Sequence, residues 1–291
     1  MSILRAIFLG IIQGITEFLP VSSSGHLAIF QNIFHMDTEG GMFFDIMLHL
    51  GTLTAVFVVY RKDILRMIRE TILICVDIVS NGKVYFNNRK YNEAFRYKKI
   101  IHNNYRKFVM LVLVSTVPTA IIGYAAKGLV ISAGKTLIVP GVSLFLTGVL
   151  LIVADISEDG HKLPKNISYT NGFFIGIAQG LATLPGLSRS GTTIAAAVIS
   201  GFDRRFAVKY SFIMSIPAIL GAAILEVKDV AGEPVSASLI GDSIVGAIVA
   251  GVVGYLCIKI MLVFVKKKKF KGFAIYCFSL GAFAILAHFV I

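Results

Sequence analysis

Residues 8–25 read FLGIIQGITEFLPVSSSG, and residues 174–191 read FIGIAQGLATLPGLSRSG. Aligned without a gap, at a constant offset of 166 residues, the two stretches are identical at eight of eighteen positions. Each stretch is an apolar run that breaks at a proline followed by serines and a glycine. A short helix, a polar break and a second short helix do not cross lipid as one rod, because irregular backbone needs protein or water around it. Both stretches therefore predict re-entrant helical hairpins.

The composition indicates an integral membrane protein. The chain has 291 residues, of which 56% are hydrophobic and 15% are charged, whereas a soluble domain has about 45–50% apolar and about 25% charged residues. These values exclude a disordered chain, a collagen-like chain and a disulfide scaffold. The apolar residues form blocks of about twenty, the length that an α-helix needs to cross a bilayer. Six blocks are long enough to span it: 41–60, 108–126, 136–154, 206–225, 239–265 and 272–291.

The two related stretches divide the chain into two repeats. The first repeat, 1–155, holds a hairpin at 3–30 and the first three spans. The second, 171–291, holds a hairpin at 171–199 and the last three spans. Three is an odd number of crossings, so the second repeat must lie upside down relative to the first. The expected fold is an all-α inverted-topology repeat, in which paired interrupted helices mark the binding site.

The charges predict an orientation. If the span 41–60 ends in the cytoplasm, the inner loops carry 22 Lys and Arg residues and the outer loops carry 4, as the positive-inside rule requires. Both termini are then external, and the basic loop 61–107 is cytoplasmic. Tyrosines interleave with the basic residues of this loop; RNA binding is one interpretation, but an interfacial belt over anionic lipid is favoured, so no nucleic-acid partner is expected. An apolar stripe in 62–79 predicts a helix along the inner surface.

Ionisable residues at membrane depth are candidates for function, because each costs about 2.5–3.5 kcal/mol on insertion scales. Glu17 and His26 lie in the first hairpin, and Arg189 lies in the second. If the hairpins enter from opposite faces, their tips meet near the midplane and Glu17 can pair with Arg189. An ion pair that only holds the two halves together is the alternative, but it leaves the neighbouring hydroxyl groups unexplained.

The serines of both breaks predict a phosphate pocket. A serine that follows a proline and precedes a helix caps that helix, and a helix N-terminus attracts anions. Arg189 adds a planar fork that matches phosphate oxygens. In the alternative interpretation, small residues only permit close helix crossing, which suits Gly10 and Gly14 but not an arginine between two serines. The candidate phosphate-binding residues are Ser22, Ser24, Gly25, Ser188, Arg189, Ser190, Gly191 and Thr193.

Glu17 indicates a binding site for a divalent cation. A carboxylate beside a phosphate pocket is repelled unless a cation or a proton lies between them, so Glu17 is interpreted as a metal ligand or as a general acid or base. Gln13 lies one helical turn earlier on the same face and can add a carbonyl ligand. The expected ion is a hard cation, Mg²⁺ or Ca²⁺. His49 and Asp45 share one face of the span 41–60; whether they border the pocket stays open.

Residues 13–26 and 185–193 closely resemble the two signature motifs of the bacterial undecaprenyl-diphosphate phosphatases, the bacitracin-resistance membrane proteins. The resemblance covers essentially the whole chain. The first motif of that family is written Glu/Gln-x-x-x-Glu, and here Gln13 occupies its first place. One of two potential carboxylates is therefore absent, and Glu17 remains as the main metal ligand.

The resemblance implies a reaction. The C55 lipid carrier undecaprenyl diphosphate is hydrolysed to undecaprenyl phosphate and inorganic phosphate, which recycles the carrier for cell-wall synthesis and confers bacitracin resistance. It also implies a multi-pass protein of the bacterial inner (cytoplasmic) membrane, with an active site that opens to the external side. A homodimer is compatible with the sequence, which does not test it.

A mechanism follows as a hypothesis. Arg189 and the two helix N-termini hold the diphosphate, and a cation on Glu17 bridges its oxygens. Ser23 attacks the terminal phosphorus, and His26, one turn away, accepts the proton. A phospho-His26 intermediate and direct attack by water stay open. The rival hypothesis is a transporter or flippase of lipid phosphate, because inverted repeats with broken helices are also transporter architecture.

Overall fold

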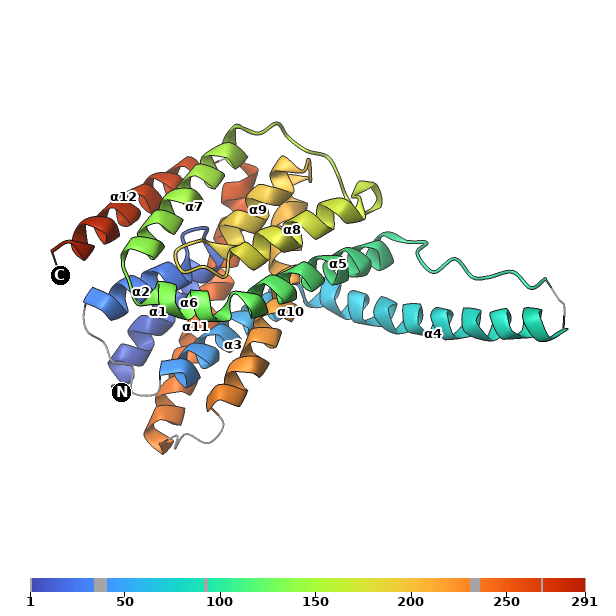
Figure 1. The fold of residues 1–291 in the computed structure, drawn as a ribbon, viewed down its shortest axis with the longest axis horizontal. Helices are drawn as coiled ribbons and strands as arrows, with labels where there is room; N and C mark the ends of the chain where they lie inside the picture. Colours follow the sequence, from blue (N-terminus) through green and yellow to red (C-terminus); the bar gives the residue numbers. More distant parts are fainter. Residues whose placement is uncertain (1, 34–40, 92–93, 231–235, 268, 291) are drawn as a thin grey trace.

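The computed structural model describes residues 2–33, 41–91, 94–230, 236–267 and 269–290. These residues form twelve α-helices, a short 3-10 helix η1 (Pro164–Asn166) and no strand, so the expected all-α class is confirmed (Figure 1). In chain order the helices are α1 (Ile3–Phe18), α2 (Ser23–Ile33), α3 (Gly41–Val59), α4 (Arg61–Tyr91), α5 (Asn104–Ala125), α6 (Lys127–Gly134), α7 (Ile138–Ile156), α8 (Tyr169–Leu181), α9 (Arg189–Ile199), α10 (Arg204–Val230), α11 (Ala237–Lys266) and α12 (Lys271–His288).

Six of the described helices are long and apolar enough to cross a membrane, as the sequence predicts. They coincide with the six expected spans, and most of their ends lie within about two residues of the predicted limits. Their outward faces are apolar, which lipid requires. The chain is therefore a multi-pass membrane protein by the length and composition of its helices.

Both broken segments consist of two short helices around an irregular turn. Helix α1 has 16 residues and α8 has 13, so each is about 20–24 Å long, short of the ~30 Å hydrocarbon core. The first break includes Ser22, whose φ is 69°, in the left-handed region that non-glycine residues rarely adopt. The second break includes Gly186, with φ of 89°. Neither segment continues as one rod through these residues.

Glycines on the two short helices let them approach long helices closely. Helix α1 packs along α11, and α8 packs along α5. A Cβ added at Gly14 would lie 2.8 Å from the carbonyl oxygen of Ala250, and one at Gly176 would lie 2.2 Å from that of Ser115. Without side chains at these positions the backbones come together, which is how helices associate in lipid. Ser115 also donates a hydrogen bond to the carbonyl of Gly172, 2.6 Å away.

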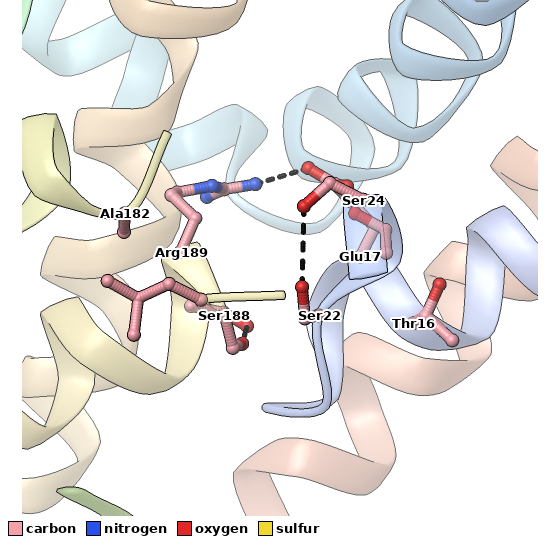
Figure 2. Close-up of a pocket in the computed structure, with 10 residues that line it drawn as sticks. Thr16, Glu17, Ser22, Ser24, Ala182, Ser188 and Arg189 are labelled. Carbon is pink, nitrogen blue, oxygen red and sulfur yellow. Dashed lines mark hydrogen bonds and ion pairs between the residues drawn. The ribbon is translucent and has the colours of Figure 1, made fainter. Parts of the chain in front are cut away.

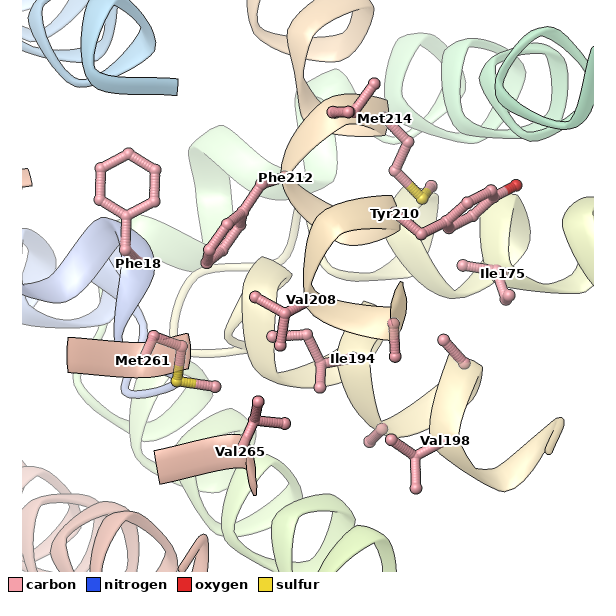
Figure 3. Close-up of a cluster of buried hydrophobic side chains, with 14 of the residues drawn as sticks. Phe18, Ile175, Ile194, Val198, Val208, Tyr210, Phe212, Met214, Met261 and Val265 are labelled. Carbon is pink, nitrogen blue, oxygen red and sulfur yellow. The ribbon is translucent and has the colours of Figure 1, made fainter. Parts of the chain in front are cut away.

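An apolar cluster fixes the end of α1 against the second half of the chain (Figure 3). The rings of Phe18 and Phe212 meet edge to face with centroids 5.3 Å apart. Met261 of α11 and Ile194 of α9 are fully buried members of the same cluster. Since Phe18 follows Glu17 directly, this packing determines where the carboxylate of Glu17 lies.

The basic segment 61–107 is more helical than the sequence predicts. The expectation was a loop with a helix over 62–79, because the apolar stripe ends there, but α4 continues to Tyr91. The additional turns contain Asn88, whose side-chain amide pairs with the backbone of Phe95. A hydrogen-bonded return segment, rather than apolar periodicity, accompanies the last turns of this helix.

The close contact of α8 with α5 predicts that two glycine-to-alanine variants differ in thermal stability. Gly176→Ala should lower the thermal unfolding temperature in detergent, because its Cβ would collide with backbone, and overpacking costs about 1–3 kcal/mol. Gly221→Ala is the control: it is also inside a helix, and nothing described lies within 4 Å of its added Cβ. It should leave the transition unchanged or raise it slightly. Equal unfolding temperatures for the two variants would contradict the packing.

Candidate functional site

The two breaks repeat the same hydrogen bonds. The hydroxyl of Ser22 accepts from the backbone N–H of Gly25 at 3.1 Å, and Ser188 accepts from Gly191 at 3.1 Å. The hydroxyl oxygens of Ser22 and Ser24 lie 3.3 Å apart, as do those of the equivalent pair in the second break. Each serine thus caps the helix that follows it, which is the geometry that the sequence predicts for both breaks.

The two hairpins touch each other through these breaks. A Cβ at Gly25 would lie 2.8 Å from the Cα of Gly186, and one at Gly191 would lie 3.2 Å from the Cβ of Pro20. The hydroxyl of Ser190 donates to the carbonyl of Leu19, 3.4 Å away. Segments that are 166 residues apart in the sequence are therefore in direct contact.

A small cavity of about 30 Å³ lies between the two broken segments. Figure 2 shows Glu17 and Arg189 approaching each other there from different segments of the chain. Eight of its ten lining residues are polar, and serines from both breaks are among them. The lining residues are Thr16, Glu17, Ser22, Ser23, Ser24, Ala182, Leu187, Ser188, Arg189 and Ser190.

Glu17 is the centre of the polar network. Its Oε1 forms an ion pair with Nη2 of Arg189. Its Oε2 accepts a hydrogen bond from the hydroxyl of Ser23 at 2.8 Å and another from Nε2 of Gln13 at 3.0 Å. The Glu17 side chain is buried, and its charge is compensated by these three donors. The structure thus brings together the expected acid, the expected guanidinium and the expected serine.

Arg189 keeps one donor free. Its Nη1 is buried and has no hydrogen-bond partner among the described residues. A buried unpaired N–H of a charged group is costly, and a guanidinium favours two-point contact with phosphate or carboxylate oxygens. An anionic ligand in the cavity would satisfy this atom.

His26 lies away from the cavity lining. Its Nδ1 is 2.7 Å from the carbonyl of Ser22, and its Nε2 is 2.6 Å from the hydroxyl of Tyr276. Because a carbonyl only accepts, Nδ1 carries the proton and Nε2 accepts from the tyrosine. The sequence interpretation paired His26 with Ser23, whereas in the structure the hydroxyl of Ser23 donates to Glu17.

Three of the residues expected to bind phosphate do not line the cavity either. Gly25 and Gly191 lie at the contact between the hairpins, where they allow close approach. The hydroxyl of Thr193 lies 2.8 Å from the carbonyl of Arg189 and 2.6 Å from the hydroxyl of Ser211. These residues support the breaks, and the roles predicted for them at the phosphate stay predictions.

Three residues near the site had weak signals or none in the sequence. Thr147 of α7 accepts from the N–H of Ser188 at 3.0 Å and donates to the carbonyl of Gly186. His49 lies 3.0 Å from Nε2 of Gln13 and 3.6 Å from the Glu17 carboxylate, although neither it nor Asp45 is among the residues that line the cavity. A threonine in an apolar span is a weak signal, and Tyr276 offered none.

The residues present fit a divalent cation whose remaining ligands would come from a substrate and water. Within the described ranges, no group of three or more His, Cys, Asp or Glu could hold a metal. The Oε1 of Gln13 is buried without a described partner, one turn from the Glu17 carboxylate. Mg²⁺ commonly uses one or two protein oxygens together with phosphate oxygens and water. Gln13 and Glu17 supply that kind of incomplete oxygen set.

Comparison with known proteins identifies the family. The model of the family described as "Bacitracin resistance protein BacA" matches residues 6–283. The chain belongs to this family. This assignment confirms the family inferred from the two motifs.

Curated members of the family match over their full length. The undecaprenyl-diphosphatase of Alkaliphilus metalliredigens is 39% identical over 286 residues, covering 98% of each chain. That of Methanosphaera stadtmanae is 35% identical over 292 aligned residues, with both chains fully covered. The undecaprenyl-diphosphatase 4 of Bacillus thuringiensis is 36% identical, covering 99% of this chain and 98% of its own.

The ion pair between the hairpins predicts strong energetic coupling. Glu17→Gln and Arg189→Gln should each lower the free energy of unfolding by about 3–5 kcal/mol, because each leaves an uncompensated buried charge. The double variant should be far more stable than the sum of the two losses implies. Chemical unfolding in detergent measures these values. As a control, Glu17→Gln combined with Arg204→Gln should be additive, because Arg204 pairs with Asp159. Additivity in both combinations would show that Glu17 and Arg189 are not in contact.

Proposed function

We propose that this chain hydrolyses undecaprenyl diphosphate to undecaprenyl phosphate and inorganic phosphate. In doing so it recycles the lipid carrier for cell-wall synthesis and confers resistance to bacitracin. The observation that carries the proposal is the meeting of Glu17, Ser23 and Arg189 in one polar cavity inside an apolar helical protein. Such a cavity suits a lipid whose only polar part is a diphosphate. Its full-length relatives are named undecaprenyl-diphosphatase, which supports the same substrate.

Substrate binding uses the second hairpin and both helix starts. The free Nη1 of Arg189 and its planar fork receive phosphate oxygens. Helix α2 begins at Ser23 and α9 begins at Arg189, so the N–H groups of both first turns lie beside the cavity and favour negative charge. The hydroxyls of Ser24 and Ser190 add further donors. These groups hold a diphosphate without any contact to the prenyl chain.

Glu17 and Gln13 would hold the divalent cation, Mg²⁺ or Ca²⁺. When bound, this ion offsets the negative charge of the diphosphate and polarises its oxygens. The unpartnered Oε1 of Gln13 and the carboxylate of Glu17 support this assignment. His49, next to both, helps to hold their side chains in place.

Ser23 is the nucleophile in this proposal. Its Oγ attacks the terminal phosphorus, and its proton passes to Oε2 of Glu17, 2.8 Å away. The bond between that phosphorus and the bridging oxygen breaks, and undecaprenyl phosphate leaves with the electron pair. Water then hydrolyses the phosphoserine, releases inorganic phosphate and returns the proton to Ser23. His26 acts through Ser22, because it fixes the carbonyl of the residue before the nucleophile.

The architecture in this proposal is an inverted repeat of two re-entrant hairpins with three spans each, in residues 1–155 and 171–291. Contacts related by the duplication support it. Helix α1 packs on α11 and α8 packs on α5. The offset of 166 residues relates α1 to α8, and α11 and α5 are each the middle one of three spans in their half of the chain. The same offset converts the contact between Gly25 and Gly186 into the contact between Gly191 and Pro20.

The proposed location is the inner (cytoplasmic) membrane, with both termini outside and the pocket open to the external face. The excess of basic residues in the predicted inner loops supports the orientation. His49, in the middle of α3, contacts Gln13, which supports a pocket near the bilayer midplane. The external opening rests on the resemblance of the motifs.

Phosphate release tests the reaction and the assigned roles. Purified protein in detergent with Mg²⁺ should release phosphate from undecaprenyl diphosphate. Ser23→Ala should lower the rate at least ~10²–10⁴-fold, and Arg189→Lys about 10³-fold or more, because lysine lacks the planar fork. Ser132→Ala is the matched control, since its hydroxyl is exposed on α6 and bonds only to the helix backbone. A near-normal rate for Ser23→Ala would exclude the serine nucleophile.

The same assay separates hydrolysis from transport. Detergent leaves no second compartment, so a transporter or flippase of lipid phosphate would release no phosphate there. Release in detergent that Arg189→Ala abolishes supports the phosphatase. Movement of lipid phosphate across vesicles without any release would support the transporter instead.

A further inference from the structure

Helix α4 presents a long apolar stripe away from the protein. The helix extends beyond the packed bundle (Figure 1), and large apolar residues recur on it at intervals of three, four and seven, so they share one face. Each is more than half exposed, from 52% for Ile68 to 69% for Phe86. We call this set the outer stripe; it consists of Leu65, Ile68, Ile72, Val76, Val79 and Phe86.

The acidic residues of α4 face the protein instead. Asp63 accepts hydrogen bonds from the hydroxyl of Tyr105 and from Nζ of Lys209, both at 3.0 Å. Arg106 donates to Glu70 at 2.9 Å and to Asp77 at 2.6 Å. These hydrogen bonds are the main cause that lowers the pKa of both carboxyl groups. All three described acids of the helix are thus paired on its inner side.

The return segment 94–103 lies on the same inner side. The side-chain amide of Asn81 donates to the carbonyl of Lys98 and accepts from its N–H, both at 2.8 Å. Asn88 makes the same pair of bonds with Phe95 at 3.0 Å. The polar face of α4 is therefore covered by the chain itself, and none of the described helices covers the outer stripe along its length.

A water-soluble helix turns its large apolar residues inward. In α4 only Ile64, Met67 and Ile74 do so, packed in the main apolar core, whereas the outer stripe stays exposed. Most of the basic residues of α4 lie on the same side of the helix as the outer stripe, and the acidic residues lie on the opposite side. All seven basic residues of α4 are exposed, and five of them lie along or beside the stripe by helical position: Arg61, Lys62, Arg69, Lys83 and Lys90. The outer surface of α4 is consequently both apolar and cationic.

We propose that the outer stripe of α4 binds the surface of a membrane that contains anionic lipids. The apolar side chains insert at the boundary of headgroups and acyl chains, and the bordering basic residues meet the lipid phosphates. The charge pattern selects this occupant over a second copy of the chain, because two such faces would bring cations against cations. The proposal rests on the side-chain pattern of α4 and not on the proposed reaction.

A natural probe lies on this face. Cys75 is exposed, whereas Cys257 and Cys277 are buried, so a polarity-sensitive fluorophore can be attached at Cys75 of the full chain in nanodiscs. In discs with phosphatidylglycerol, the emission should shift to shorter wavelength, spin-labelled lipid should quench it, and iodide should not. In discs of phosphatidylcholine alone this protection should be smaller. A fluorophore on Ala94→Cys, in a Cys75→Ser background, is the matched control and should stay accessible to iodide in both.

Removal of charge gives the second arm. Arg69→Gln combined with Lys83→Gln should lower the ratio of protected to accessible label in anionic discs about fivefold for each charge removed, while the helical circular dichroism stays unchanged. Free access of iodide to Cys75 in every lipid would overturn the proposal. Protection that appears only when two chains share a disc, with a disulfide between their Cys75 residues, would overturn it in favour of a second copy.

Discussion

The ion pair between Glu17 and Arg189 is the interaction on which the rest of the site depends. Each of these mostly buried charges would be costly alone, so each broken segment needs the other. The pair can form only because glycines and a proline at the breaks let the hairpins meet, and because Phe18 packs on Phe212 beside the carboxylate. Helix packing at the breaks and charge compensation in the cavity therefore depend on each other.

That constraint explains why the cavity is asymmetric although the two breaks are alike. The serine caps repeat with nearly identical distances, but Glu17 corresponds to Thr183 and Arg189 corresponds to Ser23 at the offset of the duplication. One broken segment supplies the carboxylate and the Ser23 hydroxyl, and the other supplies the guanidinium. A duplicated scaffold can thus build a single reaction site from two similar halves.

Much of this could be predicted because the deciding signals are local. Proline, serine and glycine predict where both segments break. An acid and an arginine in the apolar segments of one chain predict an ion pair between them. The orientation of His26 could not be predicted, because its partner Tyr276 is 250 residues away on α12. Thr147 was missed for the same reason: its role depends on contacts of its hydroxyl with Gly186 and Ser188, about forty residues away. The last turns of α4 were missed because only one residue of the outer stripe, Phe86, lies in them, and the amide pair of Asn88 with Phe95 accompanies them.

The central claim is that residues of both broken segments bind the same diphosphate group. The most direct measurement is an experimental structure of the protein with a methylene diphosphonate analogue of undecaprenyl diphosphate, which cannot be hydrolysed. The account predicts diphosphonate oxygens within hydrogen-bond distance of the Arg189 guanidinium and the Ser23 hydroxyl, in the cavity that Glu17 lines. Analogue density elsewhere, or Glu17 and Arg189 lining separate cavities, would contradict it.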